Sequence, residues 1–146
     1  MKNLLVLLAL VFSTAVFSQN WKNNFDEAKT LASKENKNIL LVFSGSDWCA
    51  PCIKLDKNIW QSDAFKAASS KSWVLVKADF PKKKEHALSE ELKKHNAALA
   101  EKYNKDGIYP LVVVLDKNGK VLGKTSFKNV SPTDYIALLH SLEKKS

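Results

Sequence analysis

The chain has 146 residues, 45% of them hydrophobic, which is enough for one domain with a substantial apolar core. Its 23 basic side chains are all lysines, against 15 acids, and the formal net charge is +8. Sequence readout and bidentate phosphate contacts favour the guanidinium group, which the chain lacks, so we expect no nucleic-acid partner. We interpret the charge as a solvated surface, with mild attraction to acidic partners or membranes as the alternative.

The first 18 residues have the pattern of a signal peptide. Lys2 gives a positive start, Leu4 to Phe12 is continuously apolar, and small or permissive residues lead to Ser18. A membrane anchor is the alternative, but the uncharged stretch from Asn3 to Asn20 is at the short limit of the ~20 apolar residues that a spanning helix needs. We expect cleavage after Ser18, a periplasmic or secreted domain over 19–146, and no stable membrane insertion afterwards.

An amphipathic helix is predicted from Trp21 to Ser33, followed by the apolar run from Ile39 to Phe43. Such a run is typical of a strand that is buried on both faces, at the centre of a sheet flanked by helices. A second helix is predicted to begin near Cys49, a few residues after this strand ends.

The chain contains two cysteines, Cys49 and Cys52, separated by Ala50 and Pro51. In an exported protein a lone pair of cysteines most often forms a structural disulfide. A bridge across so short a loop adds little stability, however, which favours a redox role. The remaining alternative is a metal site, but two thiols make half of a tetrahedral zinc shell and no histidine lies near them in sequence, so we expect no metal.

Position along the predicted helix distinguishes the two thiols. Cys49 lies at the helix start, where unpaired amides and the helix dipole favour negative charge, so we expect its pKa below the ordinary ~8.5. Cys52 lies one turn further on, within bridging reach. We predict Cys49 as the nucleophile and Cys52 as the resolving thiol, which attacks the mixed disulfide and frees the partner.

Trp48 with the Cys-Ala-Pro-Cys run that follows a buried strand resembles the active site of the thioredoxin superfamily. The sequence Phe-Ser-Gly-Ser-Asp-Trp-Cys at 43–49 resembles its exported bacterial thioredoxin-like branch in particular. The resemblance implies an α/β fold, a three-layer α/β/α arrangement with a mixed central sheet. It also implies a redox-active Cys49–Cys52 disulfide, with Trp48, Ala50 and Pro51 in contact with the substrate.

The rest of the chain follows the thioredoxin order, without a linker, repeat or second domain. The predicted elements are a helix from Ser62, a strand at Trp73–Ala78, a helix of about five turns within Phe80–Tyr103, a strand at Leu111–Leu115, a hairpin turn at Asp116–Lys120, a strand at Val121–Phe127 and a helix capped by Ser131. The Lys-rich helix over 82–103 is interpreted as a solvated cover of the sheet, with steering of a partner as the alternative. On it His95 is predicted to be partly buried, whereas His86 and His140 are predicted at the surface.

Tyr109 and Pro110 directly precede an apolar strand. A proline cannot donate to the strand ladder, so a strand's first residue is an ordinary place for it. The resemblance implies more: a cis Pro110 that faces the two cysteines, and a Tyr109 backbone that pairs with a substrate strand.

One departure from the family concerns proton transfer. Thioredoxins usually carry a buried acid in the strand before the motif, but this strand ends Val42-Phe43-Ser44. Asp47 is the nearest carboxylate and a possible proton acceptor for Cys52, although its place in a loop predicts an exposed side chain. Water is the alternative acceptor.

The dipeptide between the cysteines bears on the direction of electron flow. Ala50-Pro51 resembles the proline-containing dipeptide of reducing members, because it lacks the histidine of oxidases and isomerases. We predict a monomeric, cofactor-free disulfide reductase that acts on disulfide-containing client proteins and is kept reduced by a membrane thiol electron donor. An oxidase or isomerase, a non-catalytic binding module, and a copper carrier that uses the thiolate pair stay open.

Overall fold

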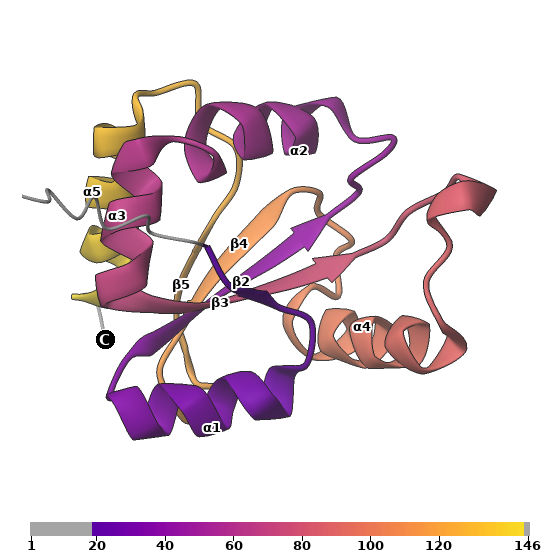
Figure 1. The fold of residues 1–146 in the computed structure, drawn as a ribbon, viewed down its shortest axis with the longest axis horizontal. Helices are drawn as coiled ribbons and strands as arrows, with labels where there is room; N and C mark the ends of the chain where they lie inside the picture. The colour runs from indigo at the N-terminus through magenta and orange to yellow at the C-terminus, as the bar shows by residue number, and fades with distance from the viewer. Residues whose placement is uncertain (1–18, 145–146) are drawn as a thin grey trace, which may run out of the picture.

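The structure is a computed structural model, and it describes residues 19–144 (Figure 1). The predicted signal peptide over 1–18 lies outside these residues. A five-stranded sheet has the order β1-β3-β2-β4-β5. The strands are β1 (Trp21–Lys22), β2 (Asn38–Ser44), β3 (Trp73–Asp79), β4 (Leu111–Leu115) and β5 (Val121–Thr125). The helices are α1 (Phe25–Glu35), α2 (Ala50–Leu55), α3 (Asp63–Ser72), α4 (Glu90–Tyr103) and α5 (Pro132–Glu143), with a π-helical turn η1 (Asp56–Trp60) and a 3-10 turn η2 (Lys84–His86).

The predicted three-layer architecture with a mixed sheet is confirmed. β1, β3 and β2 run parallel, whereas β4 is antiparallel to β2 and β5 is antiparallel to β4. Figure 1 shows α1 and α4 on one face of the sheet and α2, α3 and α5 on the other. Alternate residues of β2 enter the two cores: Leu41 packs in the core on the side of α1 and α4, and Leu40 in the core on the opposite side. Because both faces are covered, β2 is apolar along nearly its whole length.

The prediction that the first helix starts at Trp21 is wrong. Trp21 and Lys22 instead form a short edge strand, β1, that pairs with β3. α1 begins after Asn24, whose side-chain oxygen accepts a 3.0 Å hydrogen bond from the Glu27 amide. This N-cap is the physical reason for the later start, because a capping asparagine holds the first turn in place.

The predicted helix of about five turns within Phe80–Tyr103 is also too long. α4 has 14 residues and begins after Ser89, whose hydroxyl accepts a 3.2 Å hydrogen bond from the Leu92 amide. Residues 80–89 form a connection that extends away from β3 before it returns to α4 (Figure 1). Pro81 near its start and the Ser89 cap at its end explain why this stretch is not part of α4.

The three histidines differ in burial. His95 is partly buried, as predicted, and its Nε2 accepts a 3.0 Å hydrogen bond from the Phe25 amide at the start of α1. His86 is exposed, as predicted. His140 is half-buried, with its ring centroid 4.7 Å from that of Trp73.

The predictions for the C-terminal third agree with the structure apart from one boundary. Gly119 has φ +88 in the turn between β4 and β5, and Ser131 caps α5 through a 3.1 Å hydrogen bond from the Asp134 amide. β5 ends at Thr125 rather than Phe127. Within residues 19–144, no helix has the length and apolar character needed to cross a membrane.

Candidate active site

The cysteine pair lies at the start of α2, a few residues after the end of β2. β2 ends at Ser44, and Gly45 begins a turn in which its carbonyl accepts a 2.9 Å hydrogen bond from the Cys49 amide. Cys49 is the N-cap residue of α2, and Pro51 occupies the first turn, where its missing amide proton is not needed. The two cysteines form a disulfide, with their Cα atoms 5.2 Å apart.

Each of the two sulfur atoms accepts a hydrogen bond from a backbone amide. The Cys52 amide donates to Cys49 Sγ at 3.3 Å, and the Gly45 amide donates to Cys52 Sγ at 3.5 Å. The cysteines are 5% and 3% exposed, so burial alone does not separate their roles. Donors at the sulfur atoms would stabilise thiolates after reduction, and the position of Cys49 at the start of α2 favours negative charge there.

The register of the sheet brings Pro110 to the same edge. Because β4 is antiparallel to β2 and Leu111 lies opposite Phe43, the residues before β4 end up beside the residues after β2. The Tyr109–Pro110 peptide bond is cis, and the rings of Tyr109 and Trp48 meet edge to face with centroids 5.5 Å apart. The structure thus brings the two predicted substrate-contact segments together.

Hydrogen bonds also connect Pro110 to the layer of α5. The Ser126 hydroxyl donates to the Pro110 carbonyl at 2.5 Å, and the Tyr135 hydroxyl donates to the Ser126 carbonyl at 2.9 Å. Tyr135 is fully buried, and this burial raises its pKa above the ordinary value, so the hydroxyl stays a donor.

Trp48 is 39% exposed and covers the edge beside Cys49. Its indole Nε1 donates to the Phe80 carbonyl at 2.7 Å, and Lys82 Nζ lies 3.9 Å from the centroid of its ring. Trp48 packs directly over Gly45, where a Cβ atom would lie 2.7 Å from Nε1 and closer still to the ring carbons. These three neighbours, Gly45, Phe80 and Lys82, are not among the residues predicted from the sequence.

Small and apolar side chains that are close in sequence to the cysteines or to Pro110 are exposed to solvent. Ala50 and Pro51 are exposed, as contact with a substrate would require. Ile53 follows them on α2 and is 48% exposed, and Ile108, just before Tyr109, is 45% exposed. Exposed apolar side chains beside a reactive pair are suited to contact a polypeptide substrate.

The expectation that the Asp47 side chain is exposed is wrong: it is 4% exposed. One oxygen accepts a 2.9 Å hydrogen bond from the Lys82 amide, while the other accepts a 3.0 Å bond from the Lys83 amide and lies 3.0 Å from His86 Nδ1. The Lys82 bond is the largest cause that lowers the pKa of Asp47 to about 2; burial opposes it, and the contacts with Lys83 and His86 add to it. A carboxylate with so low a pKa is a weak base.

A second carboxylate forms hydrogen bonds with the turn between β2 and Trp48. Asp79 at the end of β3 accepts hydrogen bonds from the Ser46 amide and hydroxyl, at 3.0 and 2.5 Å. Asp47 and Asp79 therefore connect the turn before Trp48 to the connection after β3 from both sides. Within residues 19–144, no cluster of three or more His, Cys, Asp or Glu side chains is placed to hold a metal ion.

Comparison with known proteins supports the same fold. A family model described as Thioredoxin-like matches residues 20–117. The disulfide bond reductase DsbH of Chlamydia pneumoniae is 32% identical over 127 residues, which cover 87% of this chain and 74% of that protein. The thioredoxin-related protein DsbJ of the same organism is 24% identical and is matched over 97% of this chain but 42% of its own length.

Solved structures agree with these relatives. A structure described as DsbH Oxidoreductase has a TM-score of 0.80 and 32% identity, covering 88% of this chain and 87% of that one. A thioredoxin from Thermus thermophilus has a TM-score of 0.62 with 15% identity, covering 88% of this chain and 89% of that one, a likeness of fold.

Proposed function

Because the chain belongs to the thioredoxin-like family, we propose that its thiol-disulfide oxidoreductase activity serves to reduce disulfides in exported client proteins. The observation that carries this proposal is the Cys49–Cys52 pair, which lies at the start of α2 with backbone amides at both sulfur atoms. The similarity to a protein named disulfide bond reductase supports the reducing direction.

In the proposed reaction the Cys49 thiolate attacks one sulfur of a client disulfide. A bond forms between Cys49 and that sulfur, and the other client sulfur leaves as a thiolate that takes a proton from water. The Cys52 thiolate then attacks Cys49 Sγ, which releases the second client sulfur and forms the Cys49–Cys52 disulfide. Two electrons pass to the client, so a thiol donor must reduce the pair before the next turnover.

The other site residues take supporting roles in this proposal. Trp48, Ala50 and Pro51 contact the client beside the reacting sulfur, and the backbone of Tyr109 before Pro110 pairs with a client strand. Water rather than Asp47 takes the proton from Cys52, because the Asp47 carboxylate has a low pKa and is occupied by the Lys82 and Lys83 amides.

The place of action is part of the proposal. The predicted signal peptide over 1–18 directs a domain over 19–146 to the periplasm or the exterior, where client disulfides form. A membrane thiol protein supplies the electrons, and the domain acts as a monomer. The names of the relatives support the disulfide chemistry of this assignment.

Two measurements test the proposal. The reduction potential of the Cys49/Cys52 pair is measured by equilibration with glutathione. We expect it to be more negative than about −220 mV, the upper end of the glutathione poise. Cys52→Ser is expected to accumulate mixed disulfides with client proteins through Cys49, detected by mass spectrometry, whereas Cys49→Ser abolishes exchange.

Specific outcomes would contradict each part. A potential near that of oxidising enzymes, about −120 mV, would reverse the direction of electron flow. Capture of clients through Cys52 in a Cys49→Ser variant would show that Cys52 is the nucleophile and Cys49 the resolving thiol. An unchanged cellular effect of Cys49→Ser would favour a non-catalytic binding module, and tight stoichiometric copper binding by the reduced protein would favour a metal carrier.

A further inference from the structure

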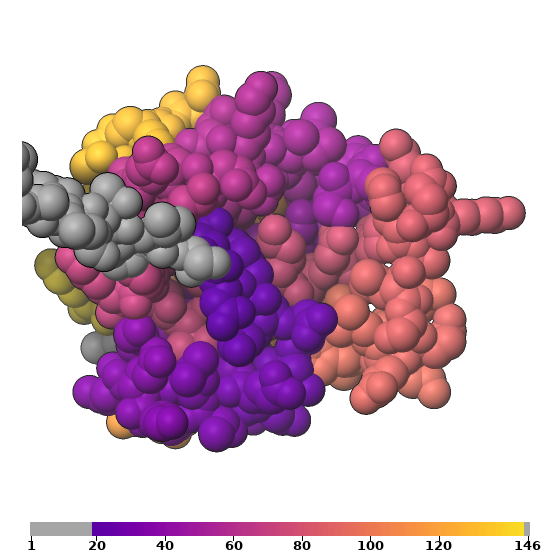
Figure 2. All heavy atoms as spheres, viewed as in Figure 1, coloured from indigo at the N-terminus to yellow at the C-terminus, as the bar shows by residue number. Residues whose placement is uncertain are grey.

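A groove lies between the connection after β3 and the start of α4. Its volume is about 380 Å³, and apolar side chains of Phe80, Pro81, Ala87 and Leu88 contribute to its lining. Figure 2 shows the connection and α4 together at the right-hand end of the molecule, away from α3 and α5. No element of the described chain, residues 19–144, fills this groove.

The groove is bordered by positive charge. Lys82, Lys83 and Lys84 line it, and in the described part of the chain none of the three forms an ion pair. Lys93, a fourth lysine of the lining, is paired with Glu90 at 2.8 Å. The acid of the lining, Asp79, already accepts hydrogen bonds from Ser46 and from the Phe80 amide. An apolar groove with unpaired lysines complements a partner that is both apolar and acidic.

The groove adjoins the active site through two residues of its lining, Phe80 and Lys82. The carbonyl of Phe80 accepts the Trp48 indole hydrogen bond, and the Phe80 ring meets that of Tyr109 with centroids 5.5 Å apart. Lys82, which lines the groove, also lies over the ring of Trp48. A client segment that is bound at Cys49 and contacts Trp48 therefore lies next to the residues of the groove.

The groove is also held in shape before any partner arrives. Asp47 fixes the Lys82 and Lys83 amides, and the side-chain amide of Asn96 on α4 donates to the Asp79 carbonyl at 3.0 Å. Because these bonds order the lining in the free protein, a partner would lose less free energy in ordering it.

We propose that this groove binds a client segment that carries an apolar side chain flanked by carboxylates, next to the disulfide to be reduced. This inference rests on the proposed reductase function and names its substrate class. Phe80, Pro81, Ala87 and Leu88 contact the apolar side chain, and Lys83 and Lys84 attract the carboxylates. The lysines raise the rate of encounter with acidic clients and discriminate against basic ones.

Matched peptides test the proposal. Reduction by the full-length protein is measured with three disulfide-bonded peptides. They carry Glu-Leu-Glu, Gln-Leu-Gln or Glu-Ser-Glu, respectively, on both sides of one of the two disulfide-bonded cysteines. We expect kcat/KM for Glu-Leu-Glu to exceed that for each of the other two by roughly three- to tenfold, since each exposed ion pair and the leucine contribute modestly. The advantage of glutamate over glutamine should shrink at 1 M salt, where the Debye length is ~3 Å.

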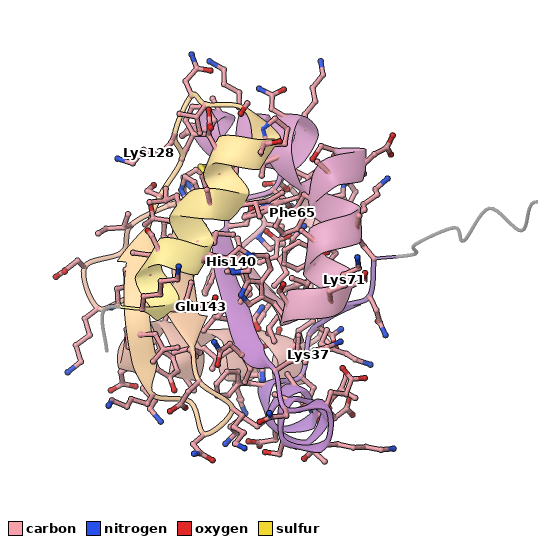
Figure 3. All side chains as sticks on the ribbon, turned by 90° about the vertical axis from the view of Figure 1, so that its left-hand side faces the viewer. Lys37, Phe65, Lys71, Lys128, His140 and Glu143 are labelled. Carbon is pink, nitrogen blue, oxygen red and sulfur yellow. A yellow bond between two sulfur atoms is a disulfide. The ribbon has the colours of Figure 1, made fainter. Side chains whose placement is uncertain are left out.

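Two double variants locate the effect. Lys83→Gln with Lys84→Gln is expected to reduce the glutamate preference about three- to fivefold, while leaving kcat/KM for Gln-Leu-Gln unchanged. Lys71→Gln with Lys128→Gln removes the same charge from the opposite end of the molecule, where Figure 3 labels both lysines, and should keep the preference. Unchanged reduction of Gln-Leu-Gln also shows that the groove variant is folded.

Each other outcome overturns the inference in a distinguishable way. If the wild-type protein reduces no peptide, the reductase function itself fails. If it reduces all three peptides equally, the reductase function stands and the groove assignment fails. Equal loss of preference in both double variants would indicate general attraction to a basic protein. Binding of phosphatidylglycerol vesicles that depends on Lys83 and Lys84, without peptide discrimination, would assign the lysines to a membrane surface.

Discussion

At the scale of single residues, Gly45 determines whether Trp48 can lie beside the disulfide. Its amide donates to Cys52 Sγ, its carbonyl accepts from the Cys49 amide, and the Trp48 ring occupies the space where a side chain would be. Gly45 has no positive φ, so its role is to leave room rather than to supply an unusual backbone conformation.

Gly45→Ala should therefore displace the indole of Trp48. We expect a loss of about 1–3 kcal/mol in the free energy of unfolding, measured with urea, as is usual for overpacking. Exchange with a disulfide substrate should slow, because Trp48 leaves the edge of the site. Gly123→Ala is the matched control: its Cβ would lie 2.7 Å from Leu142 on the α5 side, so it should lose stability with little change in the rate of exchange per folded molecule. Equal effects on exchange would contradict the role of Gly45.

The chemistry of the pair could be predicted from the sequence, whereas its surroundings could not. Cys49, Pro51 and Cys52 follow a buried strand at helical spacing, which is a local pattern. Two of the three partners of Asp47 are the amides of Lys82 and Lys83, about 35 residues further along the chain, and every residue other than proline carries such an amide. No sequence pattern marks such donors, so Asp47 was expected to be exposed.

At the scale of the elements, Glu143 fastens the end of α5 to the sheet. It accepts hydrogen bonds from Asn38 on β2 at 3.0 Å, from the Trp73 indole at the start of β3 at 2.7 Å, and lies 2.9 Å from His140 Nδ1. Figure 3 shows Glu143 and His140 together on α5. Burial raises the pKa of the Glu143 carboxyl, but the hydrogen bonds outweigh it and the net pKa is lowered.

Glu143→Gln should remove a pH-dependent part of the stability. Because the folded pKa is lowered, the unfolded chain takes up the proton first as the pH falls. The stabilisation is therefore complete above the ordinary value of 4.5 and is lost as the pH falls below it. We expect the variant to be less stable by on the order of 1 kcal/mol at pH 7 and to show a smaller deficit at pH 3, measured by urea unfolding.

Glu101→Gln, which removes the same charge from an exposed position of α4, serves as the control and should change stability little at either pH. A deficit of Glu143→Gln that is as large at pH 3 as at pH 7 would show that the ionised carboxylate is not the stabilising form.

Element boundaries were predicted well where the caps are local. Ser62 and Ser131 are the N-cap residues of α3 and α5, as expected. The start of α1 was predicted too early because the pairing of Trp21 and Lys22 with β3 is a contact with residues more than 50 positions away. Apolar spacing continues through the strand and the helix alike, so only the Asn24 cap marks the boundary.

At the scale of the whole molecule, the redox state of Cys49 and Cys52 is linked to the stability of the fold. Folding and reduction of the pair form a thermodynamic cycle. If the reduction potential is lower in the folded protein than in the unfolded chain, the disulfide form must be more stable to unfolding than the dithiol form. Strong oxidants have the reverse order, because their reduced form is stabilised. The difference in unfolding free energy therefore reports the direction of electron flow without a client.

We expect the disulfide form to unfold at a higher urea concentration than the dithiol form. A shift of about 50 mV between the folded and unfolded chain corresponds to roughly 2 kcal/mol for this two-electron couple. Unfolding curves with and without a reductant, followed by tryptophan fluorescence, give the difference. Cys49→Ala with Cys52→Ala should show no effect of the reductant, and a more stable dithiol form in the wild type would argue for an oxidase.

The attachment of the connection to Asp47 also has a consequence for the exchange of amide protons with solvent. Lys82 and Lys83 are exposed side chains of a loop, yet their amides donate to a carboxylate that is 4% exposed. In deuterated water these two amides should therefore exchange more slowly than the surface position of the loop suggests. A comparison of the disulfide and dithiol forms would then tell whether the loop opens each time that the bond between Cys49 and Cys52 is broken.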